Sequence, residues 1–275
     1  MREFRRHSTA PALLALLTWM LTGTEAHADR LTVPLSNPAK PAVVEVALVM
    51  GSIKVTAGTA KEVVIDARSR GEGGGDEGRG KHPGMQRIPN TALGLKAEEA
   101  ANKVTIGADS HSRAVDLEIQ VPAGSSLTLS TVNAGEIEVD GIDGEVDANN
   151  TNGGIAIRNV KGPVSANTIN GDVTVVFRGP VAAAPMAFST LNGTVDVTLP
   201  ASLKANVRIR SDNGEIYSDF DIALDKNPSK LEEDRQKGHY RVVLAREMTG
   251  KIGGGGPEIL FKTFNGDILL RRPKD

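Results

Sequence analysis

Apolar and polar residues alternate with a period of two over much of the chain, in short runs that glycine separates. Two positions after each glycine of the central region stands a branched aliphatic residue, and two positions later another small or apolar residue. A two-residue alternation is typical of a strand with one buried face. Each unit is therefore predicted to be a short strand followed by a turn. The glycines recur every nine residues, at Gly135, Gly144, Gly153, Gly162 and Gly171.

Every second unit ends in Asn followed by Gly, within a longer pattern of apolar-x-apolar-x-Thr-x-Asn-Gly-x-apolar-x-apolar. Six copies occur, and the first carries one extra residue between Asn and Gly. Internal repetition at a fixed spacing is the signature of a repeat architecture. The predicted corners of the repeat are Asn133, Gly135, Asn152, Gly153, Asn170, Gly171, Asn192, Gly193, Asn213, Gly214, Asn265 and Gly266.

Two all-β architectures are compatible with these units. In a single-stranded β-solenoid, two units make one coil of about 18–22 residues, and coils stack at ~4.8 Å per strand. Asn and Gly then form columns at a corner that needs φ > 0. In the alternative, each Asn-Gly is a hairpin turn in an antiparallel meander. We favour the solenoid, because the strands are short for a free-standing meander and stacking explains the glycine column.

The remaining segments suggest one elongated domain with a less regular beginning. Residues 29–123 alternate irregularly and are expected to open and cap the sheet system, since the end coils of a solenoid expose edge strands. Residues 70–84 are rich in Gly and charge and are expected to form a mobile loop. Residues 124–275 carry the repeats. A polar excursion at about 226–238 is expected to form a short helix or a solvated arm.

The first 28 residues have the features of a Sec-type signal peptide. Arg2, Arg5 and Arg6 precede the apolar run 10–23, and Ala26-His27-Ala28 supplies a small-residue cleavage site. We therefore expect cleavage after Ala28 and export to the periplasm, the cell surface or the medium. No later run is apolar over the ~20 residues that a membrane-spanning helix needs.

Composition narrows the possible chemistry. The 32 basic and 34 acidic residues give a formal net charge of −2, which argues against a nucleic-acid partner. The absence of Cys excludes a disulfide scaffold, a thiolate metal site and a Cys nucleophile. The five histidines have no ligand-like spacing. They are His7, His27, His82, His111 and His239.

Glycine-rich nine-residue repeats also build calcium β-rolls, which need a recurrent acidic ligand. The residue before each repeat glycine is instead Asp143, Asn152, Lys161 and Asn170 in turn, and Lys does not bind calcium. We therefore predict no metal and no cofactor. Outward carboxylates from stacked coils could lie at the spacing of glycoside hydrolysis, although a solvated acidic face is the simpler interpretation. These carboxylates are Glu136, Glu138, Asp140, Asp147, Asp172 and Asp196.

Three motifs resemble the bacterial putative-adhesin family, a domain of unknown function. They are Val121-Pro-Ala-Gly124, the repeat at residues 165–175 (SANTINGDVTV) and the repeat at residues 262–270 (KTFNGDILL). The resemblance covers residues 31–272 and implies a β-helix-like protein of the bacterial surface or envelope. It implies no catalytic residues.

The sequence as a whole predicts an exported, non-enzymatic β-solenoid that acts as an adhesion, interaction or envelope structural module. Its partner would be a cell-surface glycan, a protein or a second copy of the chain, bound by repeated weak contacts. The alternative is a carbohydrate-active enzyme, a polysaccharide lyase or hydrolase, on the same scaffold.

Overall fold

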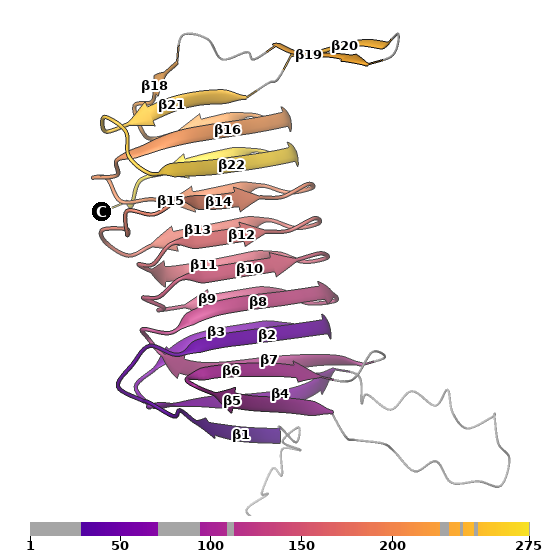
Figure 1. The fold of residues 1–275 in the computed structure, drawn as a ribbon, viewed down its shortest axis with the longest axis vertical. Coiled ribbons are helices and arrows are strands. Elements are labelled where there is room, and N and C mark those ends of the chain that lie inside the picture. The colour runs from indigo at the N-terminus through magenta and orange to yellow at the C-terminus, as the bar shows by residue number, and fades with distance from the viewer. Residues whose placement is uncertain are drawn as a thin grey trace, which may run out of the picture.

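The computed structural model describes residues 29–70, 94–108, 113–225, 231–236, 239–244 and 247–274, and within these ranges it contains strands and no helices. Two large sheets of 10 and 11 strands face each other along an elongated stack (Figure 1). This confirms the predicted all-β solenoid. Accordingly, the described ranges hold no helix with the length and apolar character to cross a bilayer. The expected signal peptide and nearly all of the Gly-rich loop lie outside the described residues.

The first sheet contains ten strands. In spatial order they are β1 (Asp29–Pro34), β4 (Glu62–Arg70), β7 (Ala114–Pro122), β3 (Ile53–Gly58), β9 (Ile137–Asp140), β11 (Ile155–Val160), β13 (Val173–Phe177), β15 (Val195–Thr198), β23 (Ile268–Arg271) and β17 (Ile216–Ser218).

The second sheet contains eleven strands. In spatial order they are β18 (Ala223–Leu224), β21 (Met248–Ile252), β16 (Ala205–Asn213), β22 (Glu258–Asn265), β14 (Met186–Ser189), β12 (Val164–Asn167), β10 (Val146–Asn150), β8 (Ser126–Asn133), β2 (Val43–Met50), β6 (Lys103–Ala108) and β5 (Leu95–Ala100). A separate antiparallel pair consists of β19 (Leu231–Gln236) and β20 (His239–Leu244). The polar excursion, where we expected a helix or an arm, therefore contains a strand.

Each coil consists of one strand from each sheet, joined by the Asn-Gly corner. Strands β8, β10, β12 and β14 pair in parallel, with Val146 in register with Leu127 on one side and Val164 on the other. On the other face of the stack, β9, β11, β13 and β15 pair in the same way. The Asn-Gly units thus connect strands of different sheets and are not hairpin turns, which rules out the meander.

The core lies between the two sheets and is filled by the inward residue of each alternating pair. Val146, Ile155 and Val173 are at most 1% exposed. Three phenylalanines fill the layers near the C-terminal end, where Phe188 stacks on Phe261 at 5.4 Å and meets Phe177 edge-on at 6.4 Å. The inward side chains of the two strands in a coil pack against each other and against those of the adjacent layers. The core is therefore continuous along the stack.

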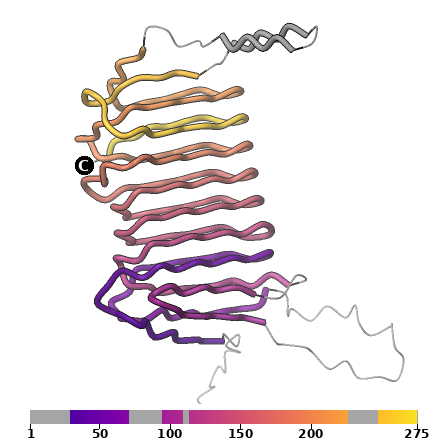
Figure 2. The backbone as a smooth tube through the Cα atoms, viewed as in Figure 1, coloured from indigo at the N-terminus to yellow at the C-terminus, as the bar shows by residue number. Residues whose placement is uncertain are grey.

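Two coils are stacked out of sequence order. The coil β2–β3 lies between β6–β7 and β8–β9. The coil β22–β23 lies between β14–β15 and β16–β17. Figure 2 shows both insertions as breaks in the colour sequence, an indigo layer beside the magenta ones and a yellow layer between orange ones. The opening segment therefore supplies an internal layer as well as strands at the end of the stack.

The chain skips one layer at two connections, and both have the same local structure. The segment VPAGS joins β7 to β8, and the segment LPASL joins β15 to β16. In each, an amide donates to the proline carbonyl three residues earlier, Ser125 to Pro122 and Leu203 to Pro200, both at 3.0 Å. The proline presets the backbone for this turn. A short Pro-Ala turn therefore stands at each connection that passes over an inserted coil, β2–β3 in the first case and β22–β23 in the second.

Antiparallel strands cover both sheets at one end of the stack and the second sheet at the other end, where the first sheet ends in the parallel strand β17. At one end β4 pairs with β7 and with β1, and β5 pairs with β6. At the other end β21 pairs with β16 and with the two-residue strand β18. These strands break the parallel pattern that the next coil would have continued. They therefore oppose end-to-end growth of the stack.

The corner glycines are needed mainly because adjacent layers approach closely. A Cβ at any of the six predicted glycines would lie 1.8–2.4 Å from a carbonyl oxygen of the adjacent layer. Positive φ, which we expected at the corner, is not the common cause. Gly153, Gly171, Gly193 and Gly266 have it as expected, at 143–156°, but Gly135 and Gly214 do not. Among the described non-glycine residues it occurs only at Ala101, Asn102, Ala134 and Asn159. The expectation of φ > 0 for the six asparagines is wrong.

Replacing Gly193 by Ala should strongly destabilise the stack. The new Cβ would meet the Gly171 carbonyl oxygen at 2.1 Å, at a φ of +154°, so we expect a loss of about 3 kcal/mol. The matched control is Gly124→Ala in the layer-skipping turn. A Cβ there has no atom within 4 Å, and we expect a change within about 0.5 kcal/mol. Urea unfolding followed by far-ultraviolet circular dichroism measures both, and equal effects would refute the close-approach explanation.

Candidate binding edge along the Asn-Gly corner

The six predicted asparagines form one continuous row of amides, which we call the amide row. Five of them donate from the side-chain Nδ2 to the Oδ1 of the asparagine in the adjacent layer, at 2.7–3.0 Å, and Asn133 at the end of the row accepts from Asn152. All six are exposed. Because the last coil is inserted, the spatial order is Asn133, Asn152, Asn170, Asn192, Asn265 and Asn213.

Beneath the amide row lies a second row of side-chain donors. Each donates to the carbonyl of a corner glycine in the adjacent layer, and Thr190, for example, bonds to Gly171 at 2.8 Å. Thr131, Thr190 and Thr263 are at most 4% exposed, so these bonds give buried hydroxyl groups the protein partner that they need. The donors are Thr131, Asn150, Thr168, Thr190, Thr263 and Ser211, at 2.8–3.1 Å.

The residue between the inner donor and the asparagine points outward, and in most layers it is large and apolar. Nine large hydrophobic side chains are exposed in the described chain, and four of them occupy this position, at 38–46% exposure. A fifth, Val49 at 38% exposure, occupies the equivalent register position on β2, where Leu48 and Met50 replace the donor and the asparagine. Strand register aligns them along the amide row. We call them the apolar row: Val49, Val132, Ile169, Leu191 and Phe264.

The alternation and the Asn-Gly motif do not by themselves single out the apolar row, although its signal is present in the sequence. It is the unspecified residue of Thr-x-Asn-Gly. Turn positions usually carry small or polar residues, so Ile169, Leu191 and Phe264 in three copies of that motif are unexpected for a corner.

The outward carboxylates are not stacked on one another, contrary to expectation. In adjacent layers Glu138 has Lys54 and Ala156 as register neighbours. The others likewise face uncharged or basic residues: Asp140 faces Thr56 and Arg158, Asp147 faces Thr128 and Ser165, and Asp196 faces Thr174 and Leu269. Stacking therefore creates no facing pair of carboxylates among these strands.

Most of these carboxylates also have a donor partner. Asp196 accepts from Arg271 Nε at 2.8 Å, Asp172 from the Thr194 amide at 2.7 Å, and Asp140 from Asn159 at 2.7 Å. Asp147 accepts from Asn149, Glu138 lies 3.8 Å from Lys54 Nζ, and Glu136 is exposed. Glu138 and Asp140 share one face of β9, about 7 Å apart by strand geometry. Among the six carboxylates predicted from the sequence, this same-strand pair is the nearest approach to a two-carboxylate site.

On the opposite edge of the stack, Asp143 joins three layers. It accepts from Arg178 at 2.8 Å and from Lys161 Nζ at 3.2 Å. Partial burial raises the pKa of Asp143, but the two cations outweigh it and hold that pKa below the ordinary value. Asp143 is therefore kept ionised as a structural clasp. Lys161 stands at a position where the β-roll pattern has a calcium ligand. Its ammonium group supplies a positive charge beside Asp143.

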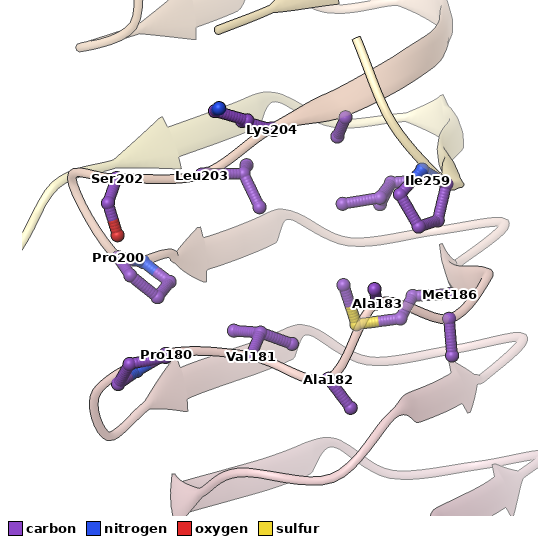
Figure 3. Close-up of a pocket in the computed structure, with 13 residues that line it drawn as sticks. Pro180, Val181, Ala182, Ala183, Met186, Pro200, Ser202, Leu203, Lys204 and Ile259 are labelled. Atoms are coloured by element: carbon purple, nitrogen blue, oxygen red, sulfur yellow. The ribbon is translucent and has the colours of Figure 1, made fainter.

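A small cleft lies on that same opposite edge, with a volume of about 210 Å³ (Figure 3). Val181, Met186, Leu203 and Ile259 are among its lining residues, which are apolar apart from Ser202 and Lys204. It therefore lacks convergent acid and base groups. The described residues also include no group of three or more His, Cys, Asp or Glu side chains that could hold a metal ion.

The stacked parallel coils and their amide row define a repetitive β-solenoid with one chemically distinct edge. Residues 91–253 match the family model Toastrack DUF4097, and the chain belongs to this family. This confirms the resemblance to a family of unknown function. The inserted coil β22–β23 lies beyond the matched residues.

Two crystal structures are similar to this chain at low sequence identity. One is described as a putative cell adhesion protein from Clostridium sporogenes, with 10% identity, a TM-score of 0.45, and coverage of 90% of this chain and 100% of that one. The other is described as a putative adhesin from Bacteroides fragilis, with 12% identity, a TM-score of 0.41, and coverage of 90% and 98%. No curated protein matches the sequence significantly.

Replacing Asn170 by Asp should destabilise the protein by about 1–2 kcal/mol. Asn170 donates to Asn152 and accepts from Asn192, and a carboxylate cannot donate. The matched control is Asn133→Asp, at the end of the row, where the side chain accepts from Asn152 and a carboxylate can do the same.

Denaturation midpoints at neutral pH should separate these two variants. At about pH 3 the new carboxyl group is protonated and can donate again. The stability difference between the Asn170→Asp variant and the wild-type protein should therefore be smaller at this pH than at neutral pH. Equal destabilisation by both substitutions would show that the direction of the amide row is unimportant.

Proposed function

We propose that this protein is an exported, non-enzymatic β-solenoid that binds a cell-surface or envelope partner along the edge formed by the amide row and the apolar row. The observation that carries the proposal is the apolar row. Five exposed hydrophobic side chains from separate layers occupy one structural position beside a row of stacked amides. The row forms two stretches, one of Val49 and Val132 and one of Ile169, Leu191 and Phe264, with Thr151 between them. Exposed apolar surface rimmed by polar groups is typical of an interaction site.

The fold itself does not require these apolar side chains. Thr151 and Asp212 occupy the same position in two other layers, where the corner retains its inner donor bond and its amide bond. A position that accepts Thr and Asp in some layers has no packing need for Leu or Phe in others. Selection for binding explains the apolar residues better than selection for stability.

The energetics favour weak contacts that add up along the stack. Burying the exposed part of one such side chain is worth about 1 kcal/mol. Five side chains would supply about 5 kcal/mol before the losses of association are subtracted, which corresponds at most to sub-millimolar binding. Several molecules engaging one surface would convert such contacts into useful avidity. This magnitude suits adhesion to a repetitive partner such as a glycan.

Two further features support export and the absence of catalysis. The features of residues 1–28 are those of a signal peptide, and a chain without Cys has no thiol to oxidise outside the cytoplasm. The outward carboxylates are mostly bound to donors, and only Glu138 and Asp140 share a strand face. The proposal therefore assigns these carboxylates to solvation and layer-to-layer contacts.

Replacing Ile169, Leu191 and Phe264 together by Thr should reduce binding while leaving the fold intact. The variant and the wild-type protein are incubated with a panel of cell-wall and exopolysaccharides, and retention on each polymer is measured. We expect retention to fall about tenfold or more, since each tenfold loss corresponds to ~1.4 kcal/mol. Circular dichroism checks the fold. We expect the fold to tolerate Thr at these positions, because Thr151 occupies the same position in another layer.

The control variant carries Leu31→Thr and Val43→Thr, two hydrophobic residues of similar exposure away from the row, and should bind normally. Unchanged retention of the triple variant on a polymer that holds the wild-type protein would contradict the proposed edge. Release of new sugar ends would contradict the non-enzymatic assignment and make Glu138 and Asp140 the first residues to replace.

A further inference from the structure

The last coil of the chain is inserted into the stack, where a sequential solenoid would have added it to the end. Strand β22 lies between β14 and β16 (Figure 1) and pairs with both. Strand β23 pairs with β15 and β17 in the same way. Both walls of this slot precede the coil in the sequence. The slot is therefore a binding site for a strand pair, which the chain's own C-terminal segment fills.

The bonds that hold the coil are the generic bonds of the repeat. On one wall Thr263 donates to the Gly193 carbonyl at 3.0 Å, and Asn265 donates to Asn192 at 2.7 Å. On the other wall Ser211 donates to Gly266 and Asn213 to Asn265, at 3.1 and 3.0 Å. These partners are separated by 52–73 residues of chain. An identical coil from a second molecule would make the same bonds.

A run of four glycines connects the inserted coil to the preceding strand. Gly253, Gly254 and Gly255 have φ of 58°, 89° and 92°, a left-handed path that glycine adopts most readily. The connection crosses the beginning of β16, where Asn206 Nδ2 donates to the Gly256 carbonyl at 2.5 Å. A Gly-rich hinge between a body and a terminal element permits the element to leave and pair elsewhere.

Exposed contacts close the far end of the coil. Arg271 Nε bonds to Asp196 Oδ1 at 2.8 Å, and these side chains are 43% and 28% exposed. The Arg272 guanidinium lies over the Phe220 ring at 4.9 Å, and its amide donates to Asp219. Exposed ion pairs contribute little stability. The coil is thus held at its end by contacts that are easily broken and reformed.

The other inserted coil is more firmly attached. Beside β2–β3, Arg70 binds both carboxylate oxygens of Asp116, the Ser52 hydroxyl and the Ala134 carbonyl. One guanidinium therefore ties the inserted layer to the layers on both sides of it. The Arg70–Asp116 pair is also exposed, at 48% and 35%, but it is bidentate and shares the guanidinium with two further acceptors, which makes it the stronger contact. Of the two insertions, the C-terminal one is better suited to exchange.

We propose that the slot between β14–β15 and β16–β17 accepts the β22–β23 coil of a second copy of this chain, so that the protein assembles by reciprocal strand exchange. The partner is defined by the repeat bonds and by the absence of a side chain at Gly266. The proposal is independent of the ligand of the binding edge. Strand exchange would nevertheless place two binding edges, each formed by an amide row and an apolar row, in one assembly. Weak contacts along the two edges would then add up by multivalency.

The first test uses a labelled peptide of residues 257–274 as a competitor for the slot. Purified exported protein is held just below its unfolding midpoint with excess peptide and then returned to native buffer. The control peptide carries Gly266→Ala, whose Cβ would meet the Gly193 carbonyl oxygen at 2.1 Å. We expect about tenfold or more retention of the native peptide over the control, since overpacking of this size corresponds to at least ~1.4 kcal/mol. Equal retention, or none of either peptide, would overturn the proposal.

The second test detects exchange between whole chains. The chain has no Cys, so introduced thiols report specifically. A Ser189→Cys variant and a differently tagged Lys262→Cys variant, which place register partners on β14 and β22, are refolded together and treated with a short thiol crosslinker. The control mixture uses Ser165→Cys and Ala187→Cys, register partners on β12 and β14.

Crosslinks between differently tagged chains that form in the 189/262 mixture and not in the control mixture would support exchange of the last coil. Crosslinks in both mixtures would indicate general association of the outer faces and would overturn the proposal. Crosslinks in neither mixture, with both proteins refolded by circular dichroism, would also overturn it.

Discussion

The interaction on which the rest of the structure depends is the hydrogen bond from the inner Thr, Ser or Asn side chain to the corner glycine carbonyl of the adjacent layer. It forms in six layers at 2.8–3.1 Å. The bond brings the corner backbones so close that no Cβ fits between them. With that spacing set, the strands on either side pair in register, and the outer asparagines come within hydrogen-bond distance. A net ~1 kcal/mol per bond is modest, but the same bond recurs in every repeat.

In-register stacking converts the chemistry of one repeat position into a row along the molecule. A row of amides and a row of exposed hydrophobic side chains arise side by side because each layer contributes one member of both. Polar substitutes at Thr151 and Asp212 indicate that the apolar members are not needed for folding. Rigid presentation of weak contacts at a regular ~4.8 Å spacing suits a repetitive partner better than a small molecule. The apolar cleft on the opposite edge lacks the polar groups that would orient such a molecule.

Local patterns were sufficient to predict the strands, the corner residues and the solenoid class. The prediction was less accurate where the cause is a contact between layers. Positive φ was assigned to the corner because Asn-Gly usually indicates it, whereas close approach is the common requirement. Stacked carboxylates were expected by default, yet Glu138 faces Lys54 and Ala156. The apolar row and the two layer-skipping turns were visible as sequence motifs, but their meaning depends on which layers become neighbours.

By itself, the sequence determined the period of the strands, the inward face of each strand and the identity of each corner, because these depend on alternation and on residues within one repeat. Only the tertiary structure decided the order of the layers. Parallel in-register units with the same Thr-x-Asn-Gly corner form equivalent bonds with any neighbour, so local sequence does not rank the possible orders. The Pro-Ala turns stand where the observed order skips a layer, and antiparallel strands stand at its ends. As a result Phe264 lies between Leu191 and Asp212, a neighbourhood that no local pattern encodes.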